Sequence, residues 1–380
     1  MSMKKILCIV GARPNFMKIA PIMRAFREQA PEIEAKLVHT GQHYDYAMNE
    51  AFFQQLEIPA PDISLEVGSG SHAQQTAEIM KRFEAVVDAE QPDCVLVVGD
   101  VNSTIACALV AAKKGVKVVH VEAGLRSRDR SMPEEINRIL TDQLSDRLYV
   151  TEREAVANLR AEGVAEHRVV FAGNVMIDTL MHNLPRAVPA ERTIAEACAR
   201  AKSLRSAATF LESDHGYAVL TLHRPSNVDD HVVLGRLLAV LEDHCYKLPL
   251  VFPVHPRTQV KIREAGYSRF LENPQVLALP PIGYLEMLGL MKGARVVLTD
   301  SGGLQEETTA LGIPCLTLRE NTERPITITE GTNILVGTDT LSIAKELGRV
   351  MTHIDVQMNR PELWDGCAAI RIVKDIQRAL

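Results

Sequence analysis

The stretch "CVLVVGDVNSTIACALVAAKKGVKVVHVE" (94–122) indicates the fold class of this chain. It begins with an apolar run that ends in Gly-Asp, continues as an alanine-rich segment of helical length closed by Gly115, and ends in a second valine-rich run. Runs this apolar are typical of strands buried on both faces of a parallel sheet. The stretch therefore predicts a strand-helix-strand unit of a doubly wound α/β domain.

The same alternation of apolar runs and helical segments extends over most of the 380 residues. A chain of this length suggests two domains of roughly 100–200 residues each. The segment 183–216 is polar, alanine-rich and without a predicted strand, and it separates two series of strands. The predicted strands are 4–10, 34–40, 94–100 and 116–122 in the first series, with a further strand at the end of the segment 133–150, and 217–223, 249–255, 275–280, 294–300, 314–319 and 333–337 in the second.

Composition and charge argue against several classes of protein. A net charge of −6 and an aromatic content of 4% argue against a nucleic-acid-binding protein. No apolar run approaches the roughly 20 residues that span a bilayer, and no signal-like leader precedes the first strand, so we expect no membrane association. The seven cysteines are scattered without a C-x-x-C pair, which predicts reduced thiols, a cytoplasmic protein and no metal site.

Basic residues follow the first predicted strand. In doubly wound sheets, ligands bind at the carboxyl ends of the strands. Strand 4–10 leads into a glycine turn at Gly11, with Arg13 and Lys18 at the start of the next helix. Such a turn suits an anion, although the spacing matches neither the dinucleotide motif nor the Walker motif. The alternative is a tight turn that carries solvated basic residues.

Acidic residues stand at the next strand ends. Asp100 and Glu122 close two strands, and Glu134 and Glu135 begin a helix after Pro133. A buried carboxylate without a partner is costly, so Glu122 indicates function. Asp100 could instead cap a helix. Acids after a helix-start proline are favoured for local reasons, and we prefer this interpretation for Glu135.

The helix that begins at Pro133 carries an apolar residue at every fourth position. Residues at this spacing lie on one face of a helix, and an apolar face normally packs against the core. We therefore expect a buried stripe formed by Ile136, Leu140, Leu144 and Leu148.

Two strands of the second series end in histidine. His223, followed by Arg224, closes strand 217–223, and His255 closes strand 249–255. A lone histidine is most often structural, but two at equivalent strand ends strengthen the case for a functional His223. His255 is equally consistent with a supporting role.

The stretch "LTDSGGLQEETTALGIP" (298–314) is the most specific signal in the second half. Ser301, Gly302 and Gly303 follow a strand and open a helix. Glycines let the backbone approach a phosphate closely, and the helix dipole favours its negative charge. Glu307, one turn further on, could reach the hydroxyl groups of an attached ribose. The alternative is a structural glycine turn.

Taken together, these segments resemble the non-hydrolysing UDP-N-acetylglucosamine 2-epimerases. The motifs that carry the resemblance occur in the order of the family, from the first strand to beyond residue 337. They are "GARPNFMKIAP" (11–21), "GD" (99–100), "HVEAGLR" (120–126), "PEEINR" (133–138), "LTLHRPSN" (220–227), "LTDSGGLQEE" (298–307) and "TERPITITEGTNILVG" (322–337).

The resemblance implies a GT-B-like fold, with two doubly wound Rossmann-like domains that face each other across a cleft. It implies a sugar-side domain at 1–174, joined by a C-terminal helix at about 366–380, and a UDP-binding domain at 175–365. Family members are generally homodimers that interconvert UDP-GlcNAc and UDP-ManNAc without a redox cofactor. The reaction proceeds by anti elimination of UDP to a 2-acetamidoglucal and re-addition.

Residue roles follow from the same resemblance. The acids required for turnover correspond to Asp100, Glu122 and Glu134. The groups near the diphosphate correspond to Arg13, Lys18 and His223 and to the backbone amides of Ser301, Gly302 and Gly303. Glu307 corresponds to the ribose ligand, and Arg138 corresponds to an active-site arginine, with a surface role on its helix as the alternative.

The chain also departs from the family pattern. Its "GQHYDYAM" (41–48) lacks the arginine of the segment "QHRxML", which contributes to an allosteric UDP-GlcNAc site in many bacterial members, so that regulation is not expected here. Its "RPSN" (224–227) replaces the more common "RREN" or "RAEN". A related epimerase of UDP-2,3-diacetamido-glucuronic acid shares most of these motifs. That enzyme, a GT-B glycosyltransferase and an inactive UDP-sugar-binding protein are the alternatives.

Overall fold

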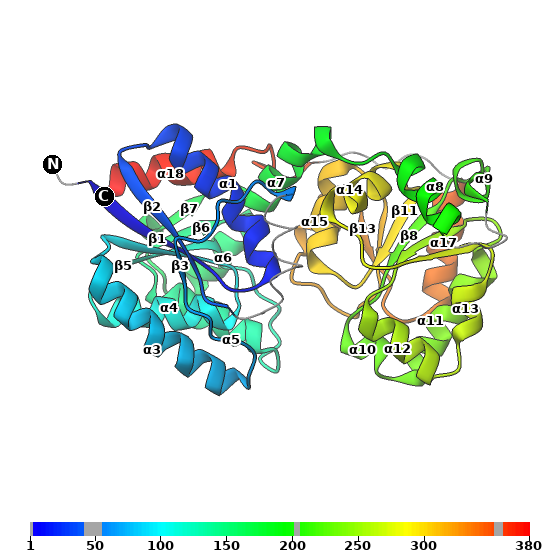
Figure 1. Cartoon of the computed structure of the whole chain (residues 1–380), viewed down its shortest axis with the longest axis horizontal. Helices are drawn as coiled ribbons and strands as arrows, with labels where there is room; N and C mark the ends of the chain where they lie inside the picture. Colours follow the sequence, from blue (N-terminus) through cyan, green and yellow to red (C-terminus); the bar gives the residue numbers. More distant parts are fainter. Residues whose placement is uncertain (1–2, 42–54, 201–205, 353–359) are drawn as a thin grey trace. The chain divides into compact units, whose positions relative to one another are not determined.

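A computed structural model describes residues 3–41, 55–200, 206–352 and 360–380, except for the side chain of Arg13. The chain divides into two compact units (Figure 1). The first unit contains residues 1–182 and 362–380, and the second contains residues 183–361. The C-terminal segment therefore returns to the unit in which the chain began. The segment 42–48, on which the expectation about allosteric regulation rests, lies outside the described residues.

The described part of the first unit contains a parallel sheet of seven strands in the order β3-β2-β1-β4-β5-β6-β7. Its longer strands follow the apolar runs of the sequence closely, whereas β3 and β7 were not predicted. These two are short strands at the edges of the sheet, where a few residues carry no periodic signal. The bounds are β1 Lys4–Val10, β2 Ile33–His39, β3 Ile63–Ser64, β4 Cys94–Val98, β5 Lys117–Ala123, β6 Arg147–Val150 and β7 Val169–Phe171.

Helices cover both faces of this sheet. In Figure 1, α1 and α18 lie side by side on one face, and α3, α4 and α5 lie on the other. The side chain of Asp178 holds α18 in place, because it accepts hydrogen bonds from the N–H groups of Ala368 and Ala369 at 3.1 and 2.7 Å. The bounds are α1 Arg13–Gln29, α3 His72–Glu90, α4 Asn102–Lys113, α5 Pro133–Leu144, α6 Arg153–Ala161, α7 Val175–Asn183 and α18 Ala368–Ala379.

The described part of the second unit repeats this design with a parallel sheet in the order β10-β9-β8-β11-β12-β13. The strands are β8 Ala218–Thr221, β9 Leu250–Pro253, β10 Val276–Leu279, β11 Val296–Thr299, β12 Cys315–Thr317 and β13 Asn333–Leu335. The helices are α8 Ala190–Arg200, α9 Ala207–Leu211, α10 Pro225–Val228, α11 His231–His244, α12 Pro256–Glu264, α13 Ser268–Glu272, α14 Tyr284–Gly293, α15 Gly302–Leu311, α16 Ile326–Thr329 and α17 Thr340–Thr352.

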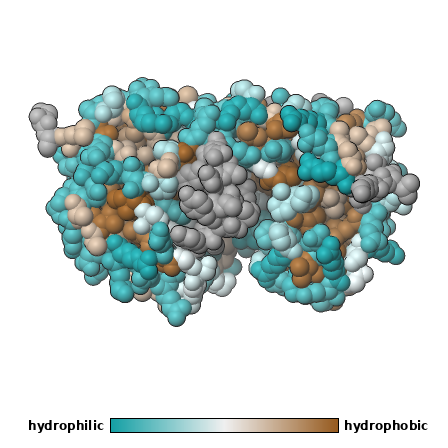
Figure 2. Space-filling model, viewed as in Figure 1, coloured by the Kyte–Doolittle hydropathy of each residue, from teal (hydrophilic) through white to brown (hydrophobic). Residues whose placement is uncertain are grey.

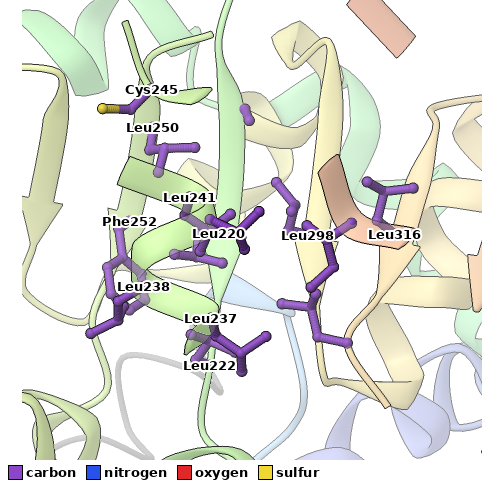
Figure 3. Close-up of a cluster of buried hydrophobic side chains, with 14 of the residues drawn as sticks. Leu220, Leu222, Leu237, Leu238, Leu241, Cys245, Leu250, Phe252, Leu298 and Leu316 are labelled. Carbon is purple, nitrogen blue, oxygen red and sulfur yellow. The ribbon is translucent and has the colours of Figure 1, made fainter. Parts of the chain in front are cut away.

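The core of the second unit lies between its sheet and the helices that cover it. Figure 3 shows Leu237, Leu238 and Leu241 of α11 directed toward Leu220 of β8 and Phe252 of β9. These five side chains are all at most 2% exposed. Such an apolar core fixes the strands, and therefore fixes where each strand ends.

Strand order reverses at one place in each sheet. The chain proceeds outward from β1 in one direction and from β4 in the other, and the second unit repeats this at β8 and β11. At such a point the connections after the two strands diverge and leave a crevice at the carboxyl ends, where ligands bind in doubly wound folds. The predicted fold class of two doubly wound α/β domains is confirmed, and these two crevices are the places to look for a site.

Helix α5 differs from expectation. Ile136 and Leu140 are 44% and 49% exposed, Leu144 is half-buried, and the buried Leu148 lies in β6 beyond the end of the helix, so the predicted stripe is not buried along α5. The helix instead buries a polar face, formed by Glu135, Arg138, Thr141 and Asp142. Burial of charged groups is tolerated only where they have partners. One of the partners of this face is Asp100, a residue of the candidate site, which pairs with Arg138.

The face of the molecule drawn in Figure 2 is mostly hydrophilic, with scattered apolar residues. Among the described residues, no helix combines the length and hydropathy that a membrane span requires. All seven cysteines are free, and six of them are buried, the exception being Cys367.

Candidate functional site

A buried ion pair lies at the carboxyl end of the first sheet. Lys18 of α1 donates a hydrogen bond to Glu122 of β5, and these residues are 6% and 4% exposed. The glycine at position 99 makes this contact feasible, because a Cβ atom there would lie 2.7 Å from Lys18 Nζ and 3.3 Å from Glu122 Oε2. Two segments that are distant in the sequence thus meet over the end of β4.

Glu122 has an unusual backbone conformation. Its φ is +71°, in the left-handed region that non-glycine residues rarely adopt. Val121 and Ala123 pair with consecutive residues of β6, Tyr149 and Val150, so Glu122 is an extra residue in a β-bulge. Bulges redirect side chains, and strained backbone of this kind is concentrated at functional sites. The bulge releases Glu122 from the strand ladder at the end of β5.

A second charged group links the end of β4 to α5. Arg138 Nε donates to Asp100 Oδ2 at 2.9 Å, and Arg138 Nη1 donates to Glu135 Oε2 at 2.7 Å. The carboxylate of Glu135 also accepts the backbone N–H groups of Ser127 and Arg128, each at 2.9 Å. Burial would raise the pKa of Glu135, but these donors outweigh burial and lower it. Glu135 therefore organises the loop before α5, a role beyond that of a favourable helix-start residue.

The remaining predicted residues of the first unit are placed differently. Glu134 is half-buried at the start of α5, one residue before Glu135. Within the described ranges it makes no hydrogen bond or ion pair, unlike its neighbour. Arg13 is the first residue of α1, and its side chain is outside the described part of the structure.

In the second unit, His223 and Asp300 form a pair across the switch point of the sheet. His223 Nδ1 lies 2.8 Å from Asp300 Oδ1, and Asp300 Oδ2 accepts the backbone N–H groups of His223 and Arg224, each at 2.9 Å. Asp300 is fully buried; burial raises its pKa, but the contacts with His223 and the backbone lower it overall. The pair fixes the His223 ring, whose side chain remains 42% exposed.

His255 has a different position from His223. It is the N-cap of α12, and its Nδ1 accepts the N–H of Arg257 at 3.2 Å. Burial and the nearby charges of His223 and Arg257 lower its pKa. A capping role thus accounts for this histidine.

The glycine turn at the start of α15 is open. Ser301 is the N-cap of the helix, and Gly302 and Gly303 form its first residues. All three are half-buried. A Cβ atom on Gly302 would have only Glu323 Oε2 within 4 Å, at 3.9 Å. The N–H of Ser301 already donates to Thr299 Oγ1 at 2.9 Å, which departs from its predicted role as a phosphate donor. The N–H groups of Gly302 and Gly303 and the helix dipole are therefore the features accessible to an anion.

One turn into α15, Glu307 is buried against a tyrosine. The hydroxyl of Tyr284 donates to Glu307 Oε1 at 2.9 Å. Burial raises the pKa of Glu307 to about 7; the tyrosine lowers it and the neighbouring Glu306 raises it. Glu306 itself pairs with Arg324 at 2.8 Å. Glu307 is thus a carboxyl group whose charge is not neutralised by an adjacent cation, and it has a second oxygen for a ligand.

The sequence predicted most of these residues but not their pairing. Asp300 and Tyr284 were not recognised as parts of the site; Asp300 had a signal, because it ends β11 as Asp100 follows β4. Tyr284 had none. Within the described ranges, no cluster of three or more His, Cys, Asp or Glu side chains is arranged to hold a metal ion.

Comparisons with known proteins identify the same family. A family profile described as UDP-N-acetylglucosamine 2-epimerase matches residues 25–377. The UDP-N-acetylglucosamine 2-epimerase of Methanococcus maripaludis is 42% identical over 343 residues, 89% of each chain. The UDP-2,3-diacetamido-2,3-dideoxy-D-glucuronate 2-epimerase of Pseudomonas aeruginosa is 42% identical over 336 residues, 88% of each chain.

A solved structure extends the likeness to three dimensions. The UDP-GlcNAc 2-epimerase of Methanocaldococcus jannaschii, in complex with UDP-GlcNAc and UDP, matches with a TM-score of 0.83 and 39% identity over 98% of this chain and 99% of that one. The GT-B-like fold class is therefore confirmed. With a family profile that spans most of its length and relatives this similar, the chain belongs to the UDP-N-acetylglucosamine 2-epimerase family.

Proposed function

We propose that this protein interconverts UDP-GlcNAc and UDP-ManNAc by anti elimination of UDP to a 2-acetamidoglucal and re-addition of UDP. The observation that carries the proposal is the group of acids at the switch point of the first sheet, where Lys18 pairs with Glu122 and Arg138 pairs with Asp100. Inversion at C2 requires acid and base groups on both faces of the sugar carbon. Asp100, Glu122 and Glu134 are the proposed groups.

The second unit is the proposed UDP-binding half. The N–H groups of Gly302 and Gly303 would bind the diphosphate, because that of Ser301 donates to Thr299 Oγ1. Glu307 would accept hydrogen bonds from the ribose. His223, oriented by Asp300 at 2.8 Å, would stabilise the charge that develops on the departing diphosphate. This function needs no cofactor, because elimination and re-addition leave the oxidation state of the sugar nucleotide unchanged overall.

The pairing of Lys18 adjusts its proposed role. The resemblance grouped Lys18 and Arg13 with the diphosphate, whereas the structure pairs the Lys18 ammonium with Glu122. We infer that Lys18 belongs to the sugar-binding part of the site when no ligand is bound. There its ammonium group neutralises the charge of the buried Glu122 carboxylate. Arg13 and Arg138 remain proposed substrate-binding residues.

Exchange of the C2 proton tests the reaction. The protein is incubated with UDP-GlcNAc in D2O, the products are separated, and each is measured by proton NMR. For the wild type we expect UDP-ManNAc to appear and both sugars to carry deuterium at C2. The variant Glu122→Gln should lose this exchange while it retains UDP binding. A glycosyltransferase of the same fold need not exchange this proton, so an absence of exchange in the wild type would contradict the mechanism.

A second substrate deserves a parallel assay. The Pseudomonas relative named for the diacetamido-glucuronate sugar is as identical to this chain as the Methanococcus relative named for UDP-GlcNAc. Each sugar nucleotide is therefore supplied separately at matched concentration. Turnover of only the uronic acid would replace UDP-GlcNAc as the substrate and would leave the elimination mechanism in place.

Three further aspects belong to the same proposal. We propose a cytoplasmic homodimer that supplies precursors for a cell-surface polysaccharide. The exposed Ile136 and Leu140 of α5, on the side of the helix away from its buried charges, support a second copy of the chain as a partner.

A further inference from the structure

Behind Asp100 and Glu122, the first unit buries another group of charged side chains. His120 of β5 and Asp142 of α5 are both fully buried, and neither belongs to the residues proposed above to touch substrate. His120 Nδ1 lies 2.7 Å from Asp142 Oδ1, and His120 Nε2 lies 2.8 Å from the carbonyl oxygen of Gly99. Each ring nitrogen of His120 therefore has an oxygen atom within hydrogen-bonding distance, one on α5 and one at the end of β4.

The other oxygen of Asp142 is also bound. Asp142 Oδ2 accepts the backbone N–H of Gly124 at 3.1 Å and Arg126 Nη2 at 2.7 Å. Arg126 in turn pairs with Glu162 at 2.6 Å. Burial lowers the pKa of Arg126, but the two carboxylates outweigh burial and raise it. Arg126 thus lies between the carboxylates of Asp142 and Glu162, and His120 binds the first of them, which explains how α5 can turn a polar face inward.

The backbone atoms that this group holds lie beside the proposed acids. Gly99 directly precedes Asp100 and has a φ of +67°, and Gly124, two residues after Glu122, has a φ of +77°. Glu122 has a φ of +71° but, unlike Gly99 and Gly124, it is not a glycine, so this backbone conformation is unfavourable for it. Residues in sparsely populated backbone regions cost of order 1–3 kcal/mol each and persist only where the surroundings fix them. The contacts to Gly99 and Gly124 fix the chain on both sides of the site.

We propose that His120 and Asp142 are positioning residues for the epimerase reaction, which brace the carboxyl ends of β4 and β5 and thereby hold Asp100 and Glu122 in place. The inference rests on the proposed function, because it concerns the acids of that reaction. It predicts a defect in the chemical step with little change in UDP binding. A purely structural role for His120 and Asp142 would instead lower stability and leave the kcat of the folded protein unchanged.

The test compares His120→Leu, His120→Gln and Asp142→Asn with the wild type. The leucine removes both ring nitrogens, and the glutamine restores a side-chain N–H group that can reach the Gly99 carbonyl. We expect His120→Leu and Asp142→Asn to lower kcat by about 10- to 100-fold with KM changed by less than about threefold, because small misplacements of reacting groups have effects of this order. His120→Gln should recover at least part of the loss.

Thr141→Val is the matched control, because Thr141 is equally buried on the same helix and its hydroxyl has no hydrogen-bond partner within the described part of the chain. It should leave kcat unchanged. Hydrogen exchange measured by mass spectrometry gives a readout that does not depend on activity. Peptides that cover 95–101 and 119–127 should exchange faster in His120→Leu and Asp142→Asn than in Thr141→Val, with little change in the second unit.

The outcomes separate this inference from the proposed function. A wild-type kcat in folded His120→Leu would overturn the proposed positioning role of His120 and Asp142. Unchanged hydrogen exchange at 95–101 and 119–127 would overturn it as well. If the wild type turns over neither UDP sugar, the proposed function fails, and the exchange experiment alone decides whether His120 and Asp142 hold these strand ends.

Discussion

At the scale of single residues, the burial of Glu307, a proposed ribose ligand, lowers the stability of the folded protein. It is 3% exposed, its hydrogen-bonding partner is the neutral Tyr284, and burial raises its pKa to about 7 from an ordinary value of 4.5. In the unfolded chain the carboxyl ionises at its ordinary pKa, but in the folded protein it holds its proton longer. Between these two pKa values the folded state binds more protons, so stability falls as pH rises.

This residue gives a prediction for Glu307→Gln. A shift of this size corresponds to about 3 kcal/mol of destabilisation above pH 7, which the neutral glutamine avoids. We expect urea unfolding to show the variant more stable than the wild type at pH 8, with little difference at pH 4. Its UDP affinity should be weaker by about 10- to 100-fold, since hydrogen bonds to a charged group contribute roughly 1.5–3 kcal/mol. Equal wild-type and variant stabilities at pH 8 would contradict the prediction.

At the scale of elements, helix α5 has one face buried beside the candidate site and another face exposed to solvent. Its buried face holds Arg138 against Asp100 at 2.8 Å, while Ile136 and Leu140 on another face are 44% and 49% exposed. An amphipathic helix normally buries its apolar face, so α5 is inverted relative to the usual pattern. The inversion is stable because the charged groups on the buried face have partners, and it leaves the apolar side chains of Ile136 and Leu140 exposed.

We predict that the double substitution Ile136→Glu and Leu140→Glu dissociates the proposed homodimer. Two charges in an apolar contact between copies would lose their hydration, which is costly. Sedimentation equilibrium should show the wild type as a dimer and the variant as a folded monomer, with its circular dichroism unchanged. The control is Leu341→Glu on α17, a leucine that is 79% exposed. A variant that remains dimeric would remove α5 from the interface.

The inversion of α5 also shows how far the sequence could predict this protein. Strands such as β1 and β4 were predictable because they are buried on both faces and read as continuous apolar runs. The acids and glycines at their ends followed from the fold rule for ligand sites. The pairing of Lys18 with Glu122 was not predictable, because the two residues are 104 positions apart and meet only through the order of the strands. The burial of the polar face of α5 was not predictable for the same reason.

At the scale of the whole chain, the C-terminal segment completes the first unit. Trp364 is fully buried there, and its Nε1 donates to the carbonyl of Thr151 at 3.1 Å. Helix α18 then packs beside α1 and buries Ile372, Val373 and Ile376. The first unit therefore depends on residues that lie beyond the second unit in the sequence.

Replacement of Trp364 by alanine should destabilise the first unit selectively. Truncation of a buried tryptophan costs about 3–5 kcal/mol. We expect differential scanning calorimetry to show one transition moved to lower temperature and assigned to the first unit by limited proteolysis. Added UDP, which the second unit is proposed to bind, should raise the temperature of the other transition in both proteins. A Trp364→Ala profile that matches the wild type would show that this contact contributes little.

The return of the C-terminal segment also determines the order in which the two units can mature during synthesis. The ribosome makes residues 183–361 before residues 362–380, so the second unit has its complete sequence while the first still lacks α18. Residues 1–182 emerge first, but the side of α1 that packs against α18 stays uncovered until residues 362–380 have been made. Incomplete domains of this kind expose apolar surface to aggregation and to chaperones. The half that carries the proposed catalytic acids is therefore the last to become native on every nascent chain.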